Sequence, residues 1–118
     1  MADEDPESRL PLPTTAFQIL VSLADGDRHG YSIMQEVEER TGGKVKLHAG
    51  TLYASIKRLL ESGWIQETTA RHGPAHDDQR RRYYRLTGAG RRVAQAELHR
   101  LEEMVKQARA SGLSPARR

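Results

Sequence analysis

Residues 48–64 contain the feature that most constrains the fold, an amphipathic helix followed at once by a change of period. Their sequence is HAGTLYASIKRLLESGW. The apolar residues recur at the spacing of one helical face, at Leu52, Ile56, Leu59 and Leu60. The opposite face is small at its start and then charged, with Gly50, Ala54, Lys57, Arg58 and Glu61. The spacing predicts a helix over residues 49–62 that packs one face in a core and offers the other to a negatively charged partner.

After Gly63 the pattern changes from helix to strand. Residues 64–70 and 81–86 are rich in aromatic and β-branched side chains, which favour strands. The polar stretch between them is too long for a tight turn. We therefore predict a β-hairpin with a long tip. Tyr84 and Leu86 are expected to face the core and Tyr83 to lie on the other face of the strand, with Trp64 in the core or an interface.

Two shorter helices are predicted upstream. Thr15 and Gln18 fit a capping box, which would open a helix that continues to about residue 24. A turn at 25–30 leads to a second helix over 31–40. The apolar stripe of that helix is expected to contain Tyr31, Ile33, Met34 and Val37.

Thr87 is expected to cap a last helix over residues 88–110, which carries a heptad-like apolar face. The face consists of Ala94, Leu98, Leu101, Met104, Val105 and Ala108. Two heptads are too few for an independent coiled coil. The face therefore either covers the core of its own chain or forms a dimer interface. We favour the dimer, because the three upstream helices already have stripes that can pair with one another.

The predicted order is three helices, a β-hairpin and a long helix. This is the winged helix-turn-helix arrangement, in which a recognition helix enters the major groove and the hairpin touches flanking backbone. The fold class is thus mainly α with a small β-hairpin, plus a long C-terminal dimerisation helix. The expected divisions are a flexible acidic tail at 1–13, a DNA-binding domain at 14–86, the dimerisation helix at 87–110 and a disordered basic tail at 111–118.

Composition narrows the function. The 118 residues include no cysteine, which excludes disulfides and thiolate catalysis. No apolar run approaches the ~18 residues of a membrane span, and the acidic start is unlike a signal peptide, so we expect a cytoplasmic protein with no membrane partner. No carboxylate cluster, phosphate-binding loop or activated nucleophile indicates an enzyme. Residues 71–92 hold seven Arg against two Asp, which fits either a polyanionic partner or simply an Arg-rich loop.

The residues expected to contact double-stranded DNA are of three kinds. Cations would neutralise phosphates, small residues at the front of the 49–62 helix would let it approach base edges, and tyrosine hydroxyls would reach phosphates. The candidates are Tyr31, Lys44, Lys46, Gly50, Thr51, Tyr53, Ser55, Lys57, Arg58, Arg80, Arg81 and Arg82. Two alternatives stay open: Lys57 and Arg58 could form an ordinary solvated face, and Tyr53 could only pack at the core edge.

Histidines give little support for a metal or cofactor. The stretch HGPAHDD at 72–78 holds two His and two Asp, but no further ligand is anchored beside it by secondary structure. We expect no metal and no cofactor. His29 is interpreted as a turn or cap residue.

Three motifs taken together resemble the PadR family of bacterial transcriptional regulators. They are HGYSIMQEVEERTGG, GTLYASIKRLLESGWI and RRYYRLTGAGRR, and the resemblance runs over residues 16–93. It implies a compact, homodimeric winged-helix DNA-binding protein, most often a repressor that a small molecule or another signal releases. The chain departs from the family pattern at His48-Ala49, where Ser or Thr followed by Pro is common, and at Ala54, where Pro is common.

The leading interpretation is a homodimeric, sequence-specific repressor. The 49–62 helix would lie in the major groove of a near-palindromic operator, and the 71–82 wing would lie on flanking backbone. The alternative is a winged-helix module for protein–protein interaction without specific DNA binding. A small-molecule inducer stays open, and its pocket would have to be aliphatic or include Trp64.

Overall fold

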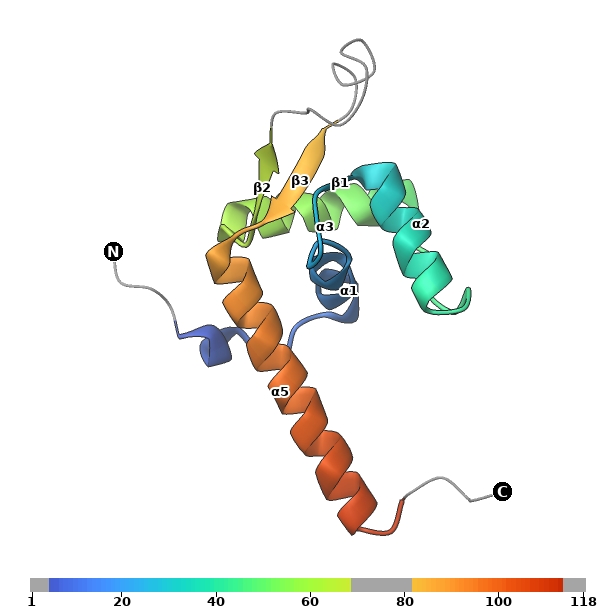
Figure 1. The fold of residues 1–118 in the computed structure, drawn as a ribbon, viewed down its shortest axis with the longest axis vertical. Coiled ribbons are helices and arrows are strands. Elements are labelled where there is room, and N and C mark those ends of the chain that lie inside the picture. Colours follow the sequence, from blue (N-terminus) through green and yellow to red (C-terminus); the bar gives the residue numbers. More distant parts are fainter. Residues whose placement is uncertain (1–4, 69–81, 114–118) are drawn as a thin grey trace.

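The computed structural model describes residues 5–68 and 82–113 (Figure 1). Its elements in chain order are η1 (Pro6–Arg9), α1 (Thr14–Ser22), β1 (Arg28–His29), α2 (Gly30–Arg40), α3 (Ala49–Ser62), β2 (Ile65–Thr68), β3 (Tyr83–Leu86) and α5 (Gly88–Ala110). Here η1 is a short 3₁₀-helix. This order confirms the predicted fold class, a mainly helical winged helix-turn-helix with a long C-terminal helix.

Local signals explain where most helices begin and end. Gly63 ends α3 in the left-handed conformation, with φ of 79°. The side chain of Thr87 caps α5 by accepting a hydrogen bond from the Gly90 N–H at 3.0 Å. His29 caps α2 in the same way, as predicted, since its Nδ1 accepts from the Ser32 N–H at 3.2 Å. The predicted capping box at the start of α1 is wrong, because Pro13 precedes the helix and no side chain caps it.

The sheet has three antiparallel strands in the order β1-β3-β2. Strand β1 lies in the stretch that was predicted to be only a turn. Its presence makes β3 the central strand, so Tyr83 and Tyr84 are both buried. Tyr84 and Leu86 face the helical core as predicted, and Tyr83 lies on the other face of the sheet, where it is nevertheless buried. The ring of Tyr83 packs edge-on against the ring of His29, with centroids 5.3 Å apart.

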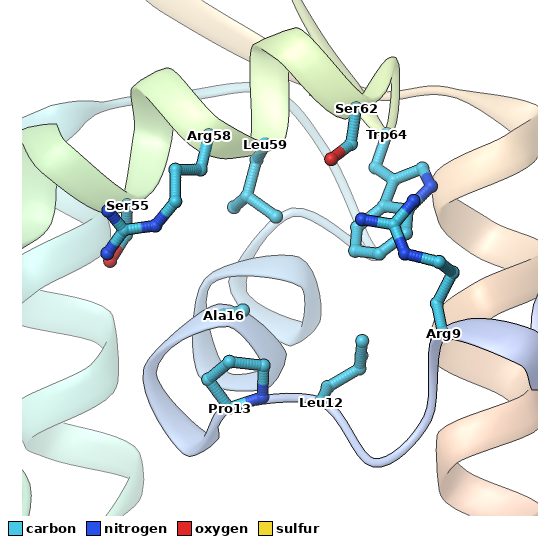
Figure 2. A pocket seen from close by; sticks show the side chains of 9 residues that line it. All are labelled: Arg9, Leu12, Pro13, Ala16, Ser55, Arg58, Leu59, Ser62 and Trp64. Atoms are coloured by element: carbon cyan, nitrogen blue, oxygen red, sulfur yellow. The ribbon is translucent and has the colours of Figure 1, made fainter.

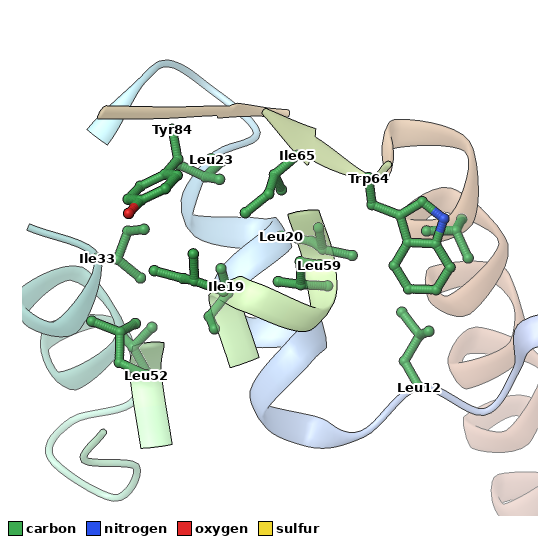
Figure 3. Close-up of a cluster of buried hydrophobic side chains, with 13 residues drawn as sticks. Leu12, Ile19, Leu20, Leu23, Ile33, Leu52, Leu59, Trp64, Ile65 and Tyr84 are labelled. Atoms are coloured by element: carbon green, nitrogen blue, oxygen red, sulfur yellow. The ribbon is translucent and has the colours of Figure 1, made fainter. Parts of the chain in front are cut away.

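The core lies where α1, α2 and α3 meet beneath the sheet (Figure 3). Its most buried side chains come from all of these elements and include Ile19, Leu20, Ile33, Val37, Leu52 and Ile65. Trp64 belongs to this core, which settles the two possibilities left for it. Tyr31 does not, because 60% of its surface is exposed, and the prediction that it joins the stripe of α2 is wrong.

Residues 5–13 differ from the predicted flexible tail. Helix η1 packs against α5, and Leu12 is buried in the core beneath Trp64 (Figure 3). The guanidinium of Arg9 lies 4.8 Å from the centre of the Trp64 ring, a cation–π contact. The leucines of this segment stand alone between prolines and form no periodic apolar pattern, so their burial could not be predicted from the sequence.

Helix α5 divides into a packed half and a projecting half (Figure 1). Near its start, Val93 is buried and the helix packs against α1 and η1. Glu97 is buried as well, and its carboxylate accepts two hydrogen bonds from Arg100 at 2.7 and 2.8 Å. The second half extends away from the other described elements.

Candidate nucleic-acid interface

Helix α3 buries one face and exposes the other. Leu52, Ile56 and Leu59 are buried, and α1 and α2 pack against this side. The exposed face begins with small residues and continues with charged ones: Gly50, Thr51, Ala54, Lys57, Arg58 and Glu61. A β-carbon added at Gly50 would meet nothing within 4 Å, so the front of the helix is open to a close neighbour. The helical period places Ala54 and Glu61 on this face, although neither was among the predicted contacts.

The start of α3 leaves backbone donors without a side-chain cap. His48 is the N-cap residue, but its side chain makes no capping hydrogen bond. The first N–H groups of a helix have no partner within the helix, and they carry the positive end of its dipole. Helix α3 therefore begins with an uncapped, positively polarised end beside Gly50 and Thr51.

Ser55 and Tyr53, two of the predicted DNA contacts on α3, differ in how exposed they are. Ser55 is only 8% exposed and points to the core side, so its placement among the outward residues is wrong. The 100° step per residue puts it at the edge of the apolar stripe, where a small residue can fall on either side. Tyr53 is 49% exposed, while its hydroxyl packs against Gly30 at the start of α2. Tyr53 thus packs at the core edge and still presents half of its surface to the outside.

Three further candidates flank α3. Tyr31, on the first turn of α2, is largely exposed, and so are Lys44 and Lys46 in the connection to α3. Lys46 lies 4.0 Å from Glu38, an exposed pair of the kind that contributes little to stability. Lys44 and Lys46 thus add exposed positive charge in the connection just before α3, and Tyr31 follows Gly30, against which the Tyr53 hydroxyl packs.

The wing is described only at its base. Arg80 and Arg81 lie outside the described residues, as do the histidines and aspartates of 72–78. Arg82 donates a hydrogen bond to Glu67 at 2.9 Å, and this bond raises the pKa of Arg82. Arg85 forms a two-pronged pair with Asp27 at 2.9 and 3.1 Å. Part of the positive charge that the sequence places at 71–92 is therefore balanced by neighbouring carboxylates.

The apolar face predicted on α5 is split between core and surface. Ala94 packs against the core of its own chain, as the alternative interpretation required. Further along, Leu98, Met104 and Val105 are each about half exposed, and Leu101 and Ala108 are partly exposed. Large apolar side chains on a projecting helix are typical of a surface that another molecule covers.

No group of three or more potential metal ligands occurs within residues 5–68 and 82–113. In the same described ranges, none of the helices has the length and apolar character needed to cross a membrane.

The arrangement defines a winged helix-turn-helix protein with an exposed, partly basic recognition helix. Residues 19–96 match the family model described as "Transcriptional regulator PadR-like family". This match spans well over half of the chain, so the protein belongs to the PadR-like family of transcriptional regulators, as the three motifs indicated.

A known protein shares part of the sequence, and two solved structures share the fold. A Lysinibacillus sphaericus protein named "Uncharacterized protein X" is 35% identical over 89 residues, which are 75% of this chain and 72% of that one. A PadR family regulator from Clostridium difficile R20291 has a similar fold, with a TM-score of 0.70 and 23% identity over 83% of this chain and 97% of that one. The structure of Bacillus subtilis PadR in complex with operator DNA gives a TM-score of 0.63 and 24% identity, over 86% of this chain and 62% of that one.

Proposed function

We propose that the protein is a homodimeric, sequence-specific DNA-binding repressor that acts in the bacterial cytoplasm. Helix α3 would enter the major groove, and residues 71–82 would lie along the flanking backbone. The observation that carries this proposal is the exposed face of α3, small at Gly50, Thr51 and Ala54 and cationic at Lys57 and Arg58. Small side chains allow close approach to base edges, and cations beside them neutralise phosphates. The operator complex of Bacillus subtilis PadR supports the same use of this fold.

The second half of α5 would supply the dimer interface. Leu98, Met104 and Val105 form an exposed apolar surface on a helix that projects from the domain. Pairing two such helices about a two-fold axis would bury these side chains. The two copies of α3 would then read half-sites one helical turn, roughly 34 Å, or a multiple of it apart. The operator is therefore expected to be close to palindromic.

One observation favours a second function, a winged-helix module that binds proteins and not specific DNA. Arg82 and Arg85 at the base of the wing are both paired with carboxylates of the same chain. In a protein-binding module, such charges would serve solubility, and binding to DNA would be weak and nearly independent of sequence.

The test is a selection of bound sequences from random duplex DNA, followed by the affinity of the selected duplex as a function of salt. A palindromic selected site with a steep negative salt slope supports the dimeric regulator. Lys57→Ala should reduce the slope by about 2 in the dimeric complex, since each of the two protomers loses one phosphate contact. Lys106→Ala, an exposed lysine on the projecting half of α5, is the matched control and should leave the slope unchanged. No enriched sequence together with a flat slope would support the protein-binding module.

A further inference from the structure

A cavity lies on the inner side of α3, away from the face proposed to meet DNA (Figure 2). Its volume is about 180 Å³, and it is lined by the N-terminal segment, the start of α1, the second half of α3 and Trp64. Sites for drug-sized ligands have volumes of about 300–1,000 Å³, so this cavity suits a smaller molecule.

One end of the cavity is lined by a buried hydroxyl and a cationic side chain. Ser55 is 92% buried, and its hydroxyl has no hydrogen-bond partner among the described residues. A buried hydroxyl without a partner is unfavourable, so such a group indicates a ligand or a water at that place. Arg58, one turn further along α3, lines the same cavity and forms no ion pair with the described residues. Figure 2 shows the guanidinium of Arg58 turned back toward Ser55, as long side chains on a helix lean toward its N-terminus.

The rest of the cavity is mainly aliphatic. Leu59 lies above it, and Leu12, Pro13 and Ala16 lie below (Figure 2). Trp64 closes the far end, but Arg9 covers the face of its ring at 4.8 Å. The covered ring face is therefore not open for an aromatic ligand to stack on, whereas the leucine and alanine surfaces accept an alkyl chain.

The geometry points to a binding site for a small carboxylate with a short aliphatic tail. The carboxylate would accept hydrogen bonds from the Arg58 guanidinium and the Ser55 hydroxyl. The tail would lie on Leu12, Ala16 and Leu59 and extend toward Trp64.

Occupation of this site would weaken DNA binding, a consequence that rests on the proposed function of α3. Arg58 lines the cavity and also lies at the edge of the exposed face of α3. A carboxylate bound to Arg58 neutralises its charge and holds the side chain on the cavity side. The phosphate contact proposed for Arg58 is then lost in each protomer.

Binding is tested on the full chain without DNA, so that its failure is separate from failure of the proposed function. The chain contains a single tryptophan, Trp64, which lines the cavity and therefore reports on it by intrinsic fluorescence. Hexanoate is the probe, and titration calorimetry provides a second readout. We expect saturable binding of hexanoate and at least tenfold weaker binding of the neutral hexanamide and of acetate, which lacks the tail.

Variants separate the carboxylate contacts from the tail contacts. Arg58→Met and Ser55→Ala should weaken hexanoate binding, Arg58→Met by at least tenfold, and Ala16→Leu should block the tail. Arg92→Met, an exposed arginine on α5, is the matched control and should bind hexanoate like the parent protein. Equal binding of hexanamide and hexanoate, undiminished binding by Arg58→Met, or no saturable signal in either readout would overturn the site.

The regulatory step is tested on the selected operator. Saturating hexanoate should lower operator affinity about tenfold or more, the size of a lost charge-assisted contact. Hexanoate binding without any effect on operator affinity would overturn the coupling and leave the site. Absence of operator binding with intact hexanoate binding would instead overturn the proposed function of α3.

Discussion

Gly90→Ala is predicted to destabilise the fold strongly, because the start of α5 touches the backbone of the turn after α3. Gly90 is buried, and a β-carbon there would collide with the carbonyl oxygen of Trp64 and lie 2.9 Å from a methyl group of Leu86. The carbonyl oxygen of Trp64 already accepts a hydrogen bond from the Thr87 N–H at 3.0 Å. The Thr87 hydroxyl also donates to the carbonyl of Gly63 at 2.7 Å. A methyl group at position 90 must therefore push α5 away from this turn.

The magnitude follows from three contributions. Inserting a methyl group into packed surroundings costs about 1–3 kcal/mol. The upper end of this range is expected here, because the methyl group meets backbone atoms that cannot move aside as a flexible side chain could. Stretching the two hydrogen bonds of Thr87 adds about 1 kcal/mol. The better helix propensity of alanine returns up to about 1 kcal/mol. The net expectation is a loss of about 2–4 kcal/mol, a large part of the about 5–15 kcal/mol that typically stabilises a domain.

The assay is urea denaturation followed by circular dichroism, at one protein concentration because association would affect apparent stability. Gly50→Ala is the matched control, since it is also a glycine in the first turn of a helix but has open space around it. Gly50→Ala should be neutral or slightly stabilising. A Gly90→Ala variant within about 0.5 kcal/mol of the parent, the size of an ordinary surface substitution, would refute the packing of α5 against the Trp64 turn.

Three further predictions concern a buried carboxylate, a helix cap and the dimer. Glu97→Gln should lower the free energy of unfolding at neutral pH, because hydrogen bonding from Arg100 lowers the pKa of Glu97 in the folded protein. The difference from the parent should be full above the ordinary glutamate pKa of about 4.3 and should fade as the pH falls through the lower pKa of the folded state. A difference that does not depend on pH in urea titrations would contradict this. His29→Ala should cost about 1–3 kcal/mol by removing both the cap of α2 and the ring contact with Tyr83, and His29→Asn, which restores only the cap, should recover about 1 kcal/mol of this in the same assay. Leu101→Glu should give monomers with much weaker operator binding, and a dimer by light scattering would place the interface elsewhere.

The helices could be predicted well wherever a period and an end signal occur together. The stripe of α3 and the left-handed Gly63 fix that helix from residue 49 to residue 62, as predicted. The cap at Thr87 and the long amphipathic run likewise fix α5 at 88–110. Both signals are local, so they can be recognised in the sequence without knowledge of the neighbours.

Contacts that depend on distant residues could not be predicted in the same way. Strand β1 has only two residues and exists because β3 pairs with it, so no alternating pattern marks it. Leu12 is buried only because α1, α3 and Trp64 together form a surface for it. Ser55 is buried although its residue type suits a DNA contact, since its direction is decided by how α3 sits on α1. In each of these cases the structure depends on tertiary packing, which the local sequence pattern does not encode.

The N-terminal segment connects the two surfaces that a dimeric regulator needs. Helix η1 packs against α5, and the backbone of Leu12 adds to the lowering of the pKa of Glu97 on α5. Leu12 also lines the cavity beneath α3. In this way α5, which carries the proposed dimer surface, is tied to the inner side of the recognition helix.

Arg58 is the residue at which this inner side meets the DNA-facing side. A ligand can shift an equilibrium only by the difference in its affinity for the two states. A carboxylate in the cavity therefore weakens DNA binding only to the extent that Arg58 serves one partner at a time. Arg58→Lys tests this exclusivity, because a lysine keeps one positive charge for phosphate but loses the planar guanidinium that binds a carboxylate with two hydrogen bonds. This variant should keep most of the operator affinity and lose most of the response to hexanoate, whereas equal losses of both would show that the two roles of Arg58 are not separable.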